Sequence, residues 1–270
     1  MSQALFRVAA VQMTSTPDTT HNLHTAARLI AQAAAQGAQL IALPEYFCLM
    51  GQQDEDKVTQ READGHGVVQ DFLAHTAQQE GVWLVGGTLP LVAPEANKVK
   101  NTVLVYNPQG ERIARYDKIH LFNFKKGEES YDEARTISCG GEVVTFDAPC
   151  GRVGLSVCYD LRFPELYRAM GPVSLILVPA AFTATTGSAH WEILLRARAI
   201  ENQCYVLAPA QSGHHPNGRH THGHSMLIDP WGVVTQVLPE GEGVVVGDID
   251  PQLLATVRTN LPALTHRVIR

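Results

Sequence analysis

The sequence has 270 residues, 45% of them hydrophobic and 18% charged, so it can bury a large core. Its formal net charge of -6 and scattered charges provide no basic surface, which excludes a nucleic-acid partner. It has no apolar run of the roughly 18 residues that a membrane span needs, no signal-peptide pattern and no Cys-x-x-Cys pair among its five cysteines, so we expect a cytoplasmic protein with reduced thiols.

The first half of the sequence predicts alternating strands and helices. An apolar run over 6–13 predicts a strand, and an alanine-rich helix over 22–36 follows and ends at Gly37. The remaining expected elements are a strand over 38–43, a helix over 68–79 that ends before Gly81, and strands over 82–88, 102–106 and 112–119.

The second half repeats this order. The expected elements are strands over 153–157 and 174–178, helices over 164–170 and 190–202, and strands over 205–210, 225–228, 233–237 and 243–248. Residues 40–47 also match 175–182 in pattern, which indicates an internal duplication. We therefore predict a single domain over 1–270 with pseudo-repeats at about 5–120 and 150–250. Its fold class is α/β, a four-layer α-β-β-α sandwich of two mixed sheets.

Glu45 and Cys158 each follow a predicted buried strand, at the carboxyl ends where α/β sheets bind ligands. Burial would raise the pKa of the Glu45 carboxyl and make it a better base. Cys158 faces a helix that begins near Pro164, and free N–H groups there favour a thiolate. Taken singly, Glu45 is more often a solvated loop carboxylate, and Cys158 a small core residue.

Lys118 supplies the fixed cation that such a pair needs. A thiol can attack a carbonyl carbon, a carboxylate can carry protons, and an ammonium can stabilise the oxyanion and lower the thiol pKa. Glu133 is a second carboxylate that would keep Lys118 protonated and oriented. The alternative for Lys118 is a side chain on the solvent-exposed face of its strand. The alternative for Glu133 is a solvated charge in the acidic stretch 128–133.

Three segments carry a resemblance to the nitrilase superfamily of carbon-nitrogen hydrolases. They are LPE ending at Glu45, DKIHL around Lys118 and CYD beginning at Cys158. The resemblance implies a Glu-Lys-Cys triad in this chain order, an αββα fold and no cofactor. The segment 131–137 is similar to the one that carries the second glutamate of the family, so Glu133 inherits that role.

Within the superfamily, residues 158–166, 187–205, 223–226 and 229–232 resemble the Nit branch. This resemblance implies a small-molecule amide substrate that bears a carboxylate, namely deaminated glutathione, cleaved to 2-oxoglutarate and cysteinylglycine. The alternatives are 2-oxoglutaramate, as in ω-amidases, and N-carbamoyl acids. A homodimer or higher homo-oligomer is also implied. The sequence differs from the residues common in the family at Asn123, at Cys139 and in the loop 46–57. These segments could border the pocket.

Two further positions complete the expected site. The backbone N–H of Tyr159 is the second candidate oxyanion donor, beside Lys118. Arg162 lies near a helix start and could bind a substrate carboxylate bidentately, or it could form a structural ion pair with Asp160 or Glu165.

The histidines between His214 and His224 suggest an alternative class, a metal-dependent hydrolase or a metal-binding module. Their spacing lacks the His-Glu-x-x-His helix pattern, and 214–219 is typical of a turn with solvated imidazoles. We therefore expect no functional metal. A catalytically silent binding protein on the same fold is the third possibility, which the presence of all three triad residues disfavours.

Overall fold

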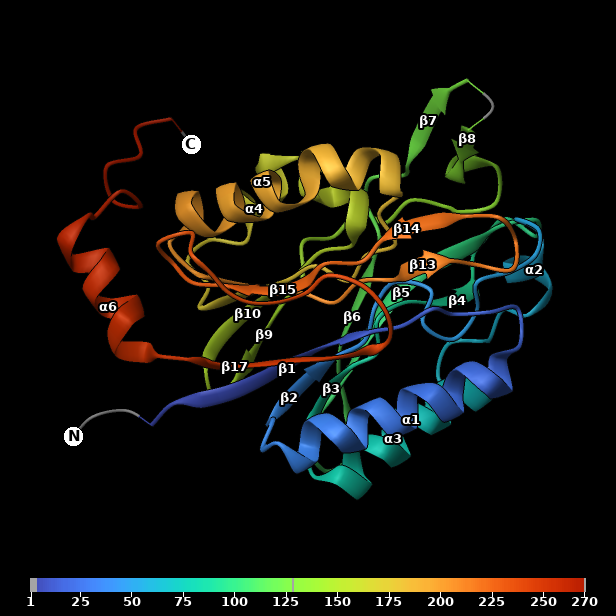
Figure 1. Ribbon diagram of the computed structural model, residues 1–270, viewed down its shortest axis with the longest axis horizontal. Helices are drawn as coiled ribbons and strands as arrows, with labels where there is room; N and C mark the ends of the chain where they lie inside the picture. The colour runs from blue at the N-terminus through green and yellow to red at the C-terminus, as the bar shows by residue number, and fades with distance from the viewer. Residues whose placement is uncertain (1–3, 128, 270) are drawn as a thin grey trace.

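The computed structural model describes residues 4–127 and 129–269, in which two large mixed sheets pack face to face between helices (Figure 1). Helices α1 (Thr19–Ala35) and α3 (Val68–Glu80) cover the first sheet. On the opposite side, α4 (Pro164–Ala169) and α5 (Ala184–Asn202) cover the second sheet. The predicted α-β-β-α sandwich is confirmed.

The first sheet has the strand order β17-β1-β2-β3-β5-β4, with β6 also pairing β5. Strands β1, β2 and β3 are parallel and the other pairings are antiparallel. The predicted strand over 243–248 completes this sheet beside β1 and so departs from the expected division into two separate halves. The strand bounds are β1 (Phe6–Gln12), β2 (Leu40–Ala42), β3 (Trp83–Val85), β4 (Leu89–Val92), β5 (Val99–Tyr106), β6 (Arg112–Asp117) and β17 (Gly243–Ile249).

The second sheet has the strand order β16-β15-β12-β11-β10-β9, with parallel pairing among β10, β11 and β12. Its strands are β9 (Thr145–Ala148), β10 (Gly151–Leu155), β11 (Leu175–Leu177), β12 (Tyr205–Ala208), β15 (Ser225–Ile228) and β16 (Val234–Leu238). The parallel strands of both sheets are short and nearly all apolar, as expected for strands buried on both faces.

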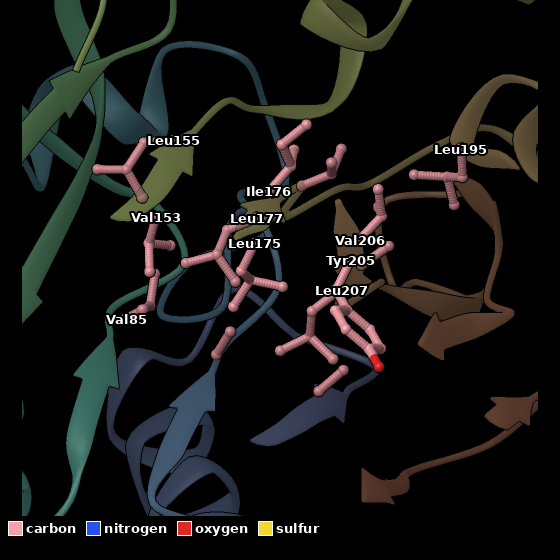
Figure 2. Packing of buried hydrophobic residues seen from close by; sticks show 14 of the residues in the cluster. Val85, Val153, Leu155, Leu175, Ile176, Leu177, Leu195, Tyr205, Val206 and Leu207 are labelled. Atoms are coloured by element: carbon pink, nitrogen blue, oxygen red, sulfur yellow. The ribbon is translucent and has the colours of Figure 1, made fainter. Parts of the chain in front are cut away.

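The core between the sheets consists mainly of aliphatic side chains from both of them, with aromatic ones such as Tyr205 among them (Figure 2). Val85 of the first sheet and Val153, Leu177 and Leu207 of the second are each 0% exposed. Burying one such side chain contributes about 1.5–3 kcal/mol to folding. This packing fixes the strand ends of one sheet relative to those of the other, and the candidate site is built from both.

Several short elements were not predicted from the sequence. The additions are the helices α2 (Asp56–Thr59) and α6 (Pro251–Asn260), the 3-10 helices η1 (Glu133–Arg135) and η2 (Cys158–Arg162), the sheet strands β4 and β9, and the hairpin strands β7 (Asn123–Lys126), β8 (Glu129–Asp132), β13 (Ser212–His214) and β14 (His220–His222). Helix α5 begins at Ala184 instead of position 190, because the Thr183 side chain caps it by accepting from the Thr186 N–H. In the described part of the chain, no helix is both long and apolar enough to cross a bilayer.

Candidate active site

Cys158 lies in a tight turn where the chain leaves β10 for η2. Its φ is 49°, in the left-handed region that a cysteine rarely adopts, and its N–H donates to the Pro179 carbonyl over 2.9 Å. The Asp160 carboxylate accepts from the Val157 N–H over 2.8 Å and closes the turn. Strained backbone held by neighbouring bonds is typical of functional sites, and here it fixes a side chain that is 8% exposed.

Glu45 follows β2, and its carboxylate is almost completely buried. One oxygen, Oε1, accepts from Lys118 Nζ and from Asn101 Nδ2, both over 2.9 Å. The other, Oε2, accepts from the Ala181 N–H over 2.9 Å. Since Ala181 follows a strand of the second sheet, both sheets hold this carboxylate. The alternative of a solvated loop carboxylate is wrong.

The backbone around Glu45 is equally constrained. The Gln211 side chain donates to the Glu45 carbonyl over 3.0 Å. Gly87 has a φ of +35°, and a Cβ there would lie 2.1 Å from the Pro44 carbonyl oxygen. Only glycine allows the chain to pass so close to the residue that precedes Glu45.

Lys118 comes directly after β6, and its side chain is 0% exposed, so the alternative of a wet strand face is wrong. Besides Glu45, its Nζ contacts Glu133 Oε1 at 3.0 Å and Oε2 at 2.8 Å. Glu133 also accepts from the Tyr46 hydroxyl over 2.8 Å and from the Phe122 N–H over 2.7 Å. The structure therefore brings Glu45, Lys118, Glu133 and Cys158 together.

Asp160 joins the turn that carries Cys158 to the segment that carries Lys118. Its buried carboxylate accepts from the Tyr116 hydroxyl over 2.6 Å and from the His120 N–H over 2.9 Å. The His120 Nδ1 lies 2.7 Å from the same carboxylate. Because Tyr116 and His120 flank Lys118, Asp160 sets the position of the ammonium relative to the thiol.

The charges of the site follow from burial and from mutual contacts. Burial raises the pKa of Glu45, the Lys118 ammonium opposes this rise, and the nearby Glu133 charge adds to it. Although burial lowers the pKa of Lys118, the two carboxylates raise it well above its usual value. Burial likewise raises the pKa of Glu133, but Lys118 and the hydrogen bonds lower it below its usual value. The ammonium is therefore charged, and Glu133 is its permanent counterion.

The Cys158 thiol differs from the sequence-based expectation. Burial raises its pKa well above the usual value, the Glu45 charge raises it further, and the opposing effect of Lys118 is smaller. The expectation that the helix N-terminus and the Lys118 ammonium lower the thiol pKa is therefore wrong. The thiol is protonated at neutral pH, so attack on a substrate requires a nearby base, and Glu45 is close enough to influence the thiol pKa.

Cys158 lies where two hollows of the surface meet. Four residues line both hollows, namely Phe122, Cys158, Ala181 and Thr183. The first hollow extends past Glu133 to Arg219 and is bordered by the loop 46–57, as the sequence suggested. The second extends over Tyr159 to Arg162. A substrate whose reactive carbon lies at Cys158 can thus extend in two directions.

Arg162 pairs with neither Asp160 nor Glu165, so the structural ion pair considered from the sequence is wrong. Its guanidinium lies 5.4 Å from the centre of the Phe182 ring, with Nη1 3.2 Å from His190 Nδ1. Across residues 4–127 and 129–269, no carboxylate forms an ion pair with it. It lines the second hollow with donors available for an anion.

The histidine group lies on and around the β13–β14 hairpin. Two stacked pairs form, His214 on His220 and His222 on His224, with ring centres 3.9 and 4.1 Å apart. The expected solvated turn is wrong for His215, which is buried against the Ser15 carbonyl and the Thr221 hydroxyl. Within the described ranges, no group of three histidine, cysteine or acidic residues could hold a metal ion.

Sequence reasoning missed three residues of the site. Asn101 is a polar residue in the apolar strand β5, a signal that could have identified it. Tyr46 directly follows Glu45, and its left-handed φ of 58° directs the hydroxyl to Glu133. Arg219 comes from a turn with no periodic pattern, and the sequence offered no signal for it.

A thiol, two carboxylates and an ammonium, buried where the strand ends of two mixed sheets meet, define a hydrolase of the amidase class. The chain belongs to the carbon-nitrogen hydrolase family, whose model matches residues 7–259, and it hydrolyses carbon-nitrogen amide bonds. It is 45% identical over 269 residues to the deaminated glutathione amidase of Synechocystis, covering 97% of this chain and 98% of that one.

Two solved structures are also similar. The Caenorhabditis elegans NitFhit protein superposes with a TM-score of 0.90 at 37% identity, covering 99% of this chain and 66% of that one. Nit3 of Saccharomyces cerevisiae, a nitrilase-superfamily member, superposes with a TM-score of 0.86 at 31% identity, covering 97% of this chain and 96% of that one. The family resemblance of the sequence is confirmed.

Proposed function

We propose that this protein hydrolyses the amide bond of deaminated glutathione to 2-oxoglutarate and cysteinylglycine. The observation that carries the proposal is the buried cluster in which Lys118 contacts Glu45 and Glu133 beside the Cys158 thiol. The similarity to the deaminated glutathione amidase of Synechocystis supports the choice of substrate.

In the first step, Glu45 accepts the proton of Cys158 while Sγ forms a bond to the amide carbon of the substrate. Negative charge then develops on the amide oxygen. The Lys118 ammonium and the Tyr159 N–H stabilise that oxyanion. The raised pKa of Glu45 brings it closer to that of the thiol, which makes the proton transfer less unfavourable.

In the second step, Glu45 gives its proton to the leaving nitrogen, the carbon–nitrogen bond breaks, and a thioester remains on Cys158. Glu45 then removes a proton from water, whose oxygen attacks the thioester carbon. The carbon–sulfur bond breaks, the acid leaves, and Glu45 returns its proton to Sγ, which restores the thiol. Glu133 takes no proton. It holds Lys118 in place through contacts of 2.8 and 3.0 Å. No step requires a metal or a cofactor.

Arg162 binds the carboxylate of the 2-oxo acid in this proposal. The guanidinium is planar and can bind a carboxylate through two parallel hydrogen bonds. Its place over the Phe182 ring, in a hollow that includes Cys158, supports this role. An Arg162→Lys variant, which keeps the charge but loses the planar fork, should raise KM more than it lowers kcat.

The test compares Cys158→Ala and Glu45→Gln with the parent and with Cys139→Ala, which removes an exposed thiol. We expect Cys158→Ala to release neither 2-oxoglutarate nor cysteinylglycine, and Cys139→Ala to match the parent. Intact-mass spectrometry of the parent, quenched during turnover, should detect a 2-oxoglutaryl adduct on Cys158, whereas Glu45→Gln, which lacks the base for attack, should show neither products nor adduct. Parental turnover by Cys158→Ala would contradict the mechanism. Turnover of 2-oxoglutaramate or N-carbamoyl acids alone would contradict the substrate.

The homo-oligomer and the cytoplasmic location expected from the sequence stay predictions. Sedimentation of the purified protein checks the first. Fractionation of the cells that produce it checks the second.

A further inference from the structure

Arg219 lies in the hollow that extends from Cys158 away from Arg162. We propose that it binds a second anion, the carboxylate at the glycine end of the leaving group. This inference rests on the proposed function and extends it, because it makes the enzyme selective for amides with a carboxylate on each side of the scissile bond.

The position of Arg219 is fixed by its backbone and by the neighbouring loop. Its N–H donates to the Asn217 side chain over 3.0 Å, and its carbonyl accepts from the His215 N–H over 2.8 Å. Asn217 in turn donates to the Gly51 carbonyl over 2.7 Å. The guanidinium lies 5.3 Å from the centre of the Tyr131 ring. A cation held in this way is preorganised for a ligand and loses little entropy on binding.

The carboxylates that line this hollow are mostly paired with basic side chains, because Glu45 and Glu133 both contact Lys118. Arg219 Nη2 donates to Asp54 Oδ1 over 2.8 Å, and Lys57 Nζ lies 3.4 Å from the same oxygen, so two basic side chains share one carboxylate. In the described part of the chain, the other guanidinium N–H groups of Arg219 have no acceptor. Asp132 also lines this hollow, but its side chain is exposed to solvent. Arg219 therefore keeps the donors for a bidentate carboxylate.

The two arginines divide the substrate at Cys158. Deaminated glutathione has a carboxylate on its 2-oxo acid and another on its terminal glycine. The carboxylate of the 2-oxo acid then lies at Arg162 and the amide carbon at Cys158. The carboxylate of the terminal glycine lies on the leaving-group side, where the hollow contains Arg219. The rival substrate 2-oxoglutaramate releases ammonia and has no carboxylate on that side, so Arg219 distinguishes the two.

The test measures kcat and KM for both substrates in the parent, in Arg219→Gln and in Arg135→Gln. Arg135 is the matched control, because it is an exposed arginine that pairs with Glu55 and lines neither hollow. Losing a charged hydrogen-bonded pair should raise KM for deaminated glutathione about 10- to 100-fold. KM for 2-oxoglutaramate should change less than about twofold, and Arg135→Gln should match the parent for both substrates.

A second arm alters the ligand instead of the protein. Deaminated glutathione with its terminal carboxylate converted to an amide should show a similarly raised KM with the parent enzyme, and Arg219→Gln should raise it no further. This arm holds even if Arg219→Gln folds poorly, since the parent alone measures the value of the carboxylate. Equal KM values for the acid and the amide in the parent would overturn the inference while leaving the proposed function intact. A parent that cleaves 2-oxoglutaramate but not deaminated glutathione would refute the proposed substrate and the inference together.

Discussion

Glu133→Gln tests whether the second carboxylate of the site only orients Lys118. In the structure, Glu133 accepts from Lys118 Nζ at both oxygens, from the Tyr46 hydroxyl and from the Phe122 N–H. A glutamine has one acceptor oxygen, so its amide nitrogen must face donors at the other position. The variant keeps the shape of the side chain but removes the permanent counterion of the ammonium.

The size of the effect follows from these contacts. A hydrogen bond to a charged group contributes about 1.5–3 kcal/mol, so the variant should be destabilised by about that amount. Lys118 would then keep the Glu45 carboxylate but have only a neutral amide oxygen in place of the Glu133 carboxylate. A misplaced oxyanion donor costs about 100- to 1000-fold in kcat. The direction in which the pH profile shifts also follows from the structure, since the Glu133 charge raises the pKa of Glu45. Removing it lowers that pKa, so the acid limb of kcat/KM moves to lower pH.

The assay records kcat and kcat/KM against pH, together with the thermal unfolding midpoint, for the parent, Glu133→Gln and Glu55→Gln. Glu55 is exposed and, among the residues that the structure describes, its side chain pairs only with Arg135, so its variant controls for the loss of one negative charge. A kcat within twofold of the parent, with an unmoved acid limb, would refute the positioning role of Glu133.

Three other changes have defined outcomes. Asp160→Asn should lower the free energy of unfolding by about 2–4 kcal/mol, because an amide cannot accept every hydrogen bond of that buried carboxylate, and urea denaturation measures this. Gly87→Ala should greatly reduce both stability and kcat, because its Cβ would lie 2.1 Å from the Pro44 carbonyl oxygen. Gly81 has a φ of +65°, but a Cβ there would meet no atom of the described residues within 4 Å, so Gly81→Ala should cost only about 1 kcal/mol. Prolonged chelation should leave kcat unchanged, and loss of activity restored by zinc would instead support a metal-dependent reaction.

The sequence predicted the parts of the site that lie at the ends of regular strands. Glu45 and Cys158 follow short apolar runs, so periodicity places both at sheet edges. Lys118 was expected inside an alternating strand, near its end, and the structure has it directly after β6. Glu133 was expected from the need of Lys118 for a second carboxylate and from the family resemblance, but not from periodicity, because it lies on a single 3-10 turn. The thiol pKa was missed for a different reason, since it depends on burial and on Glu45, which only the folded structure reveals.

The elements that were missed depend on caps and on long-range contacts. Helix α6 has Asp250 as its cap and Pro251 in its first turn, a pattern that could have been recognised. The first residues of α5 include threonine, serine and glycine, which form helices poorly by themselves. Arg219 reaches the hollow only because its hairpin packs on the loop 46–57, a contact between segments far apart in the chain.

Glu45 belongs to the first sheet, yet the N–H of Ala181 in the second sheet holds its carboxylate. Activity therefore reports on the docking of the two sheets and not on the folding of either alone. During unfolding, turnover should disappear as soon as the sheets separate, while helical circular dichroism still persists. By the same reasoning, two fragments made by one cut between β6 and β9 would be inert apart and active only after they reassemble, when the second fragment returns β17 to the first sheet.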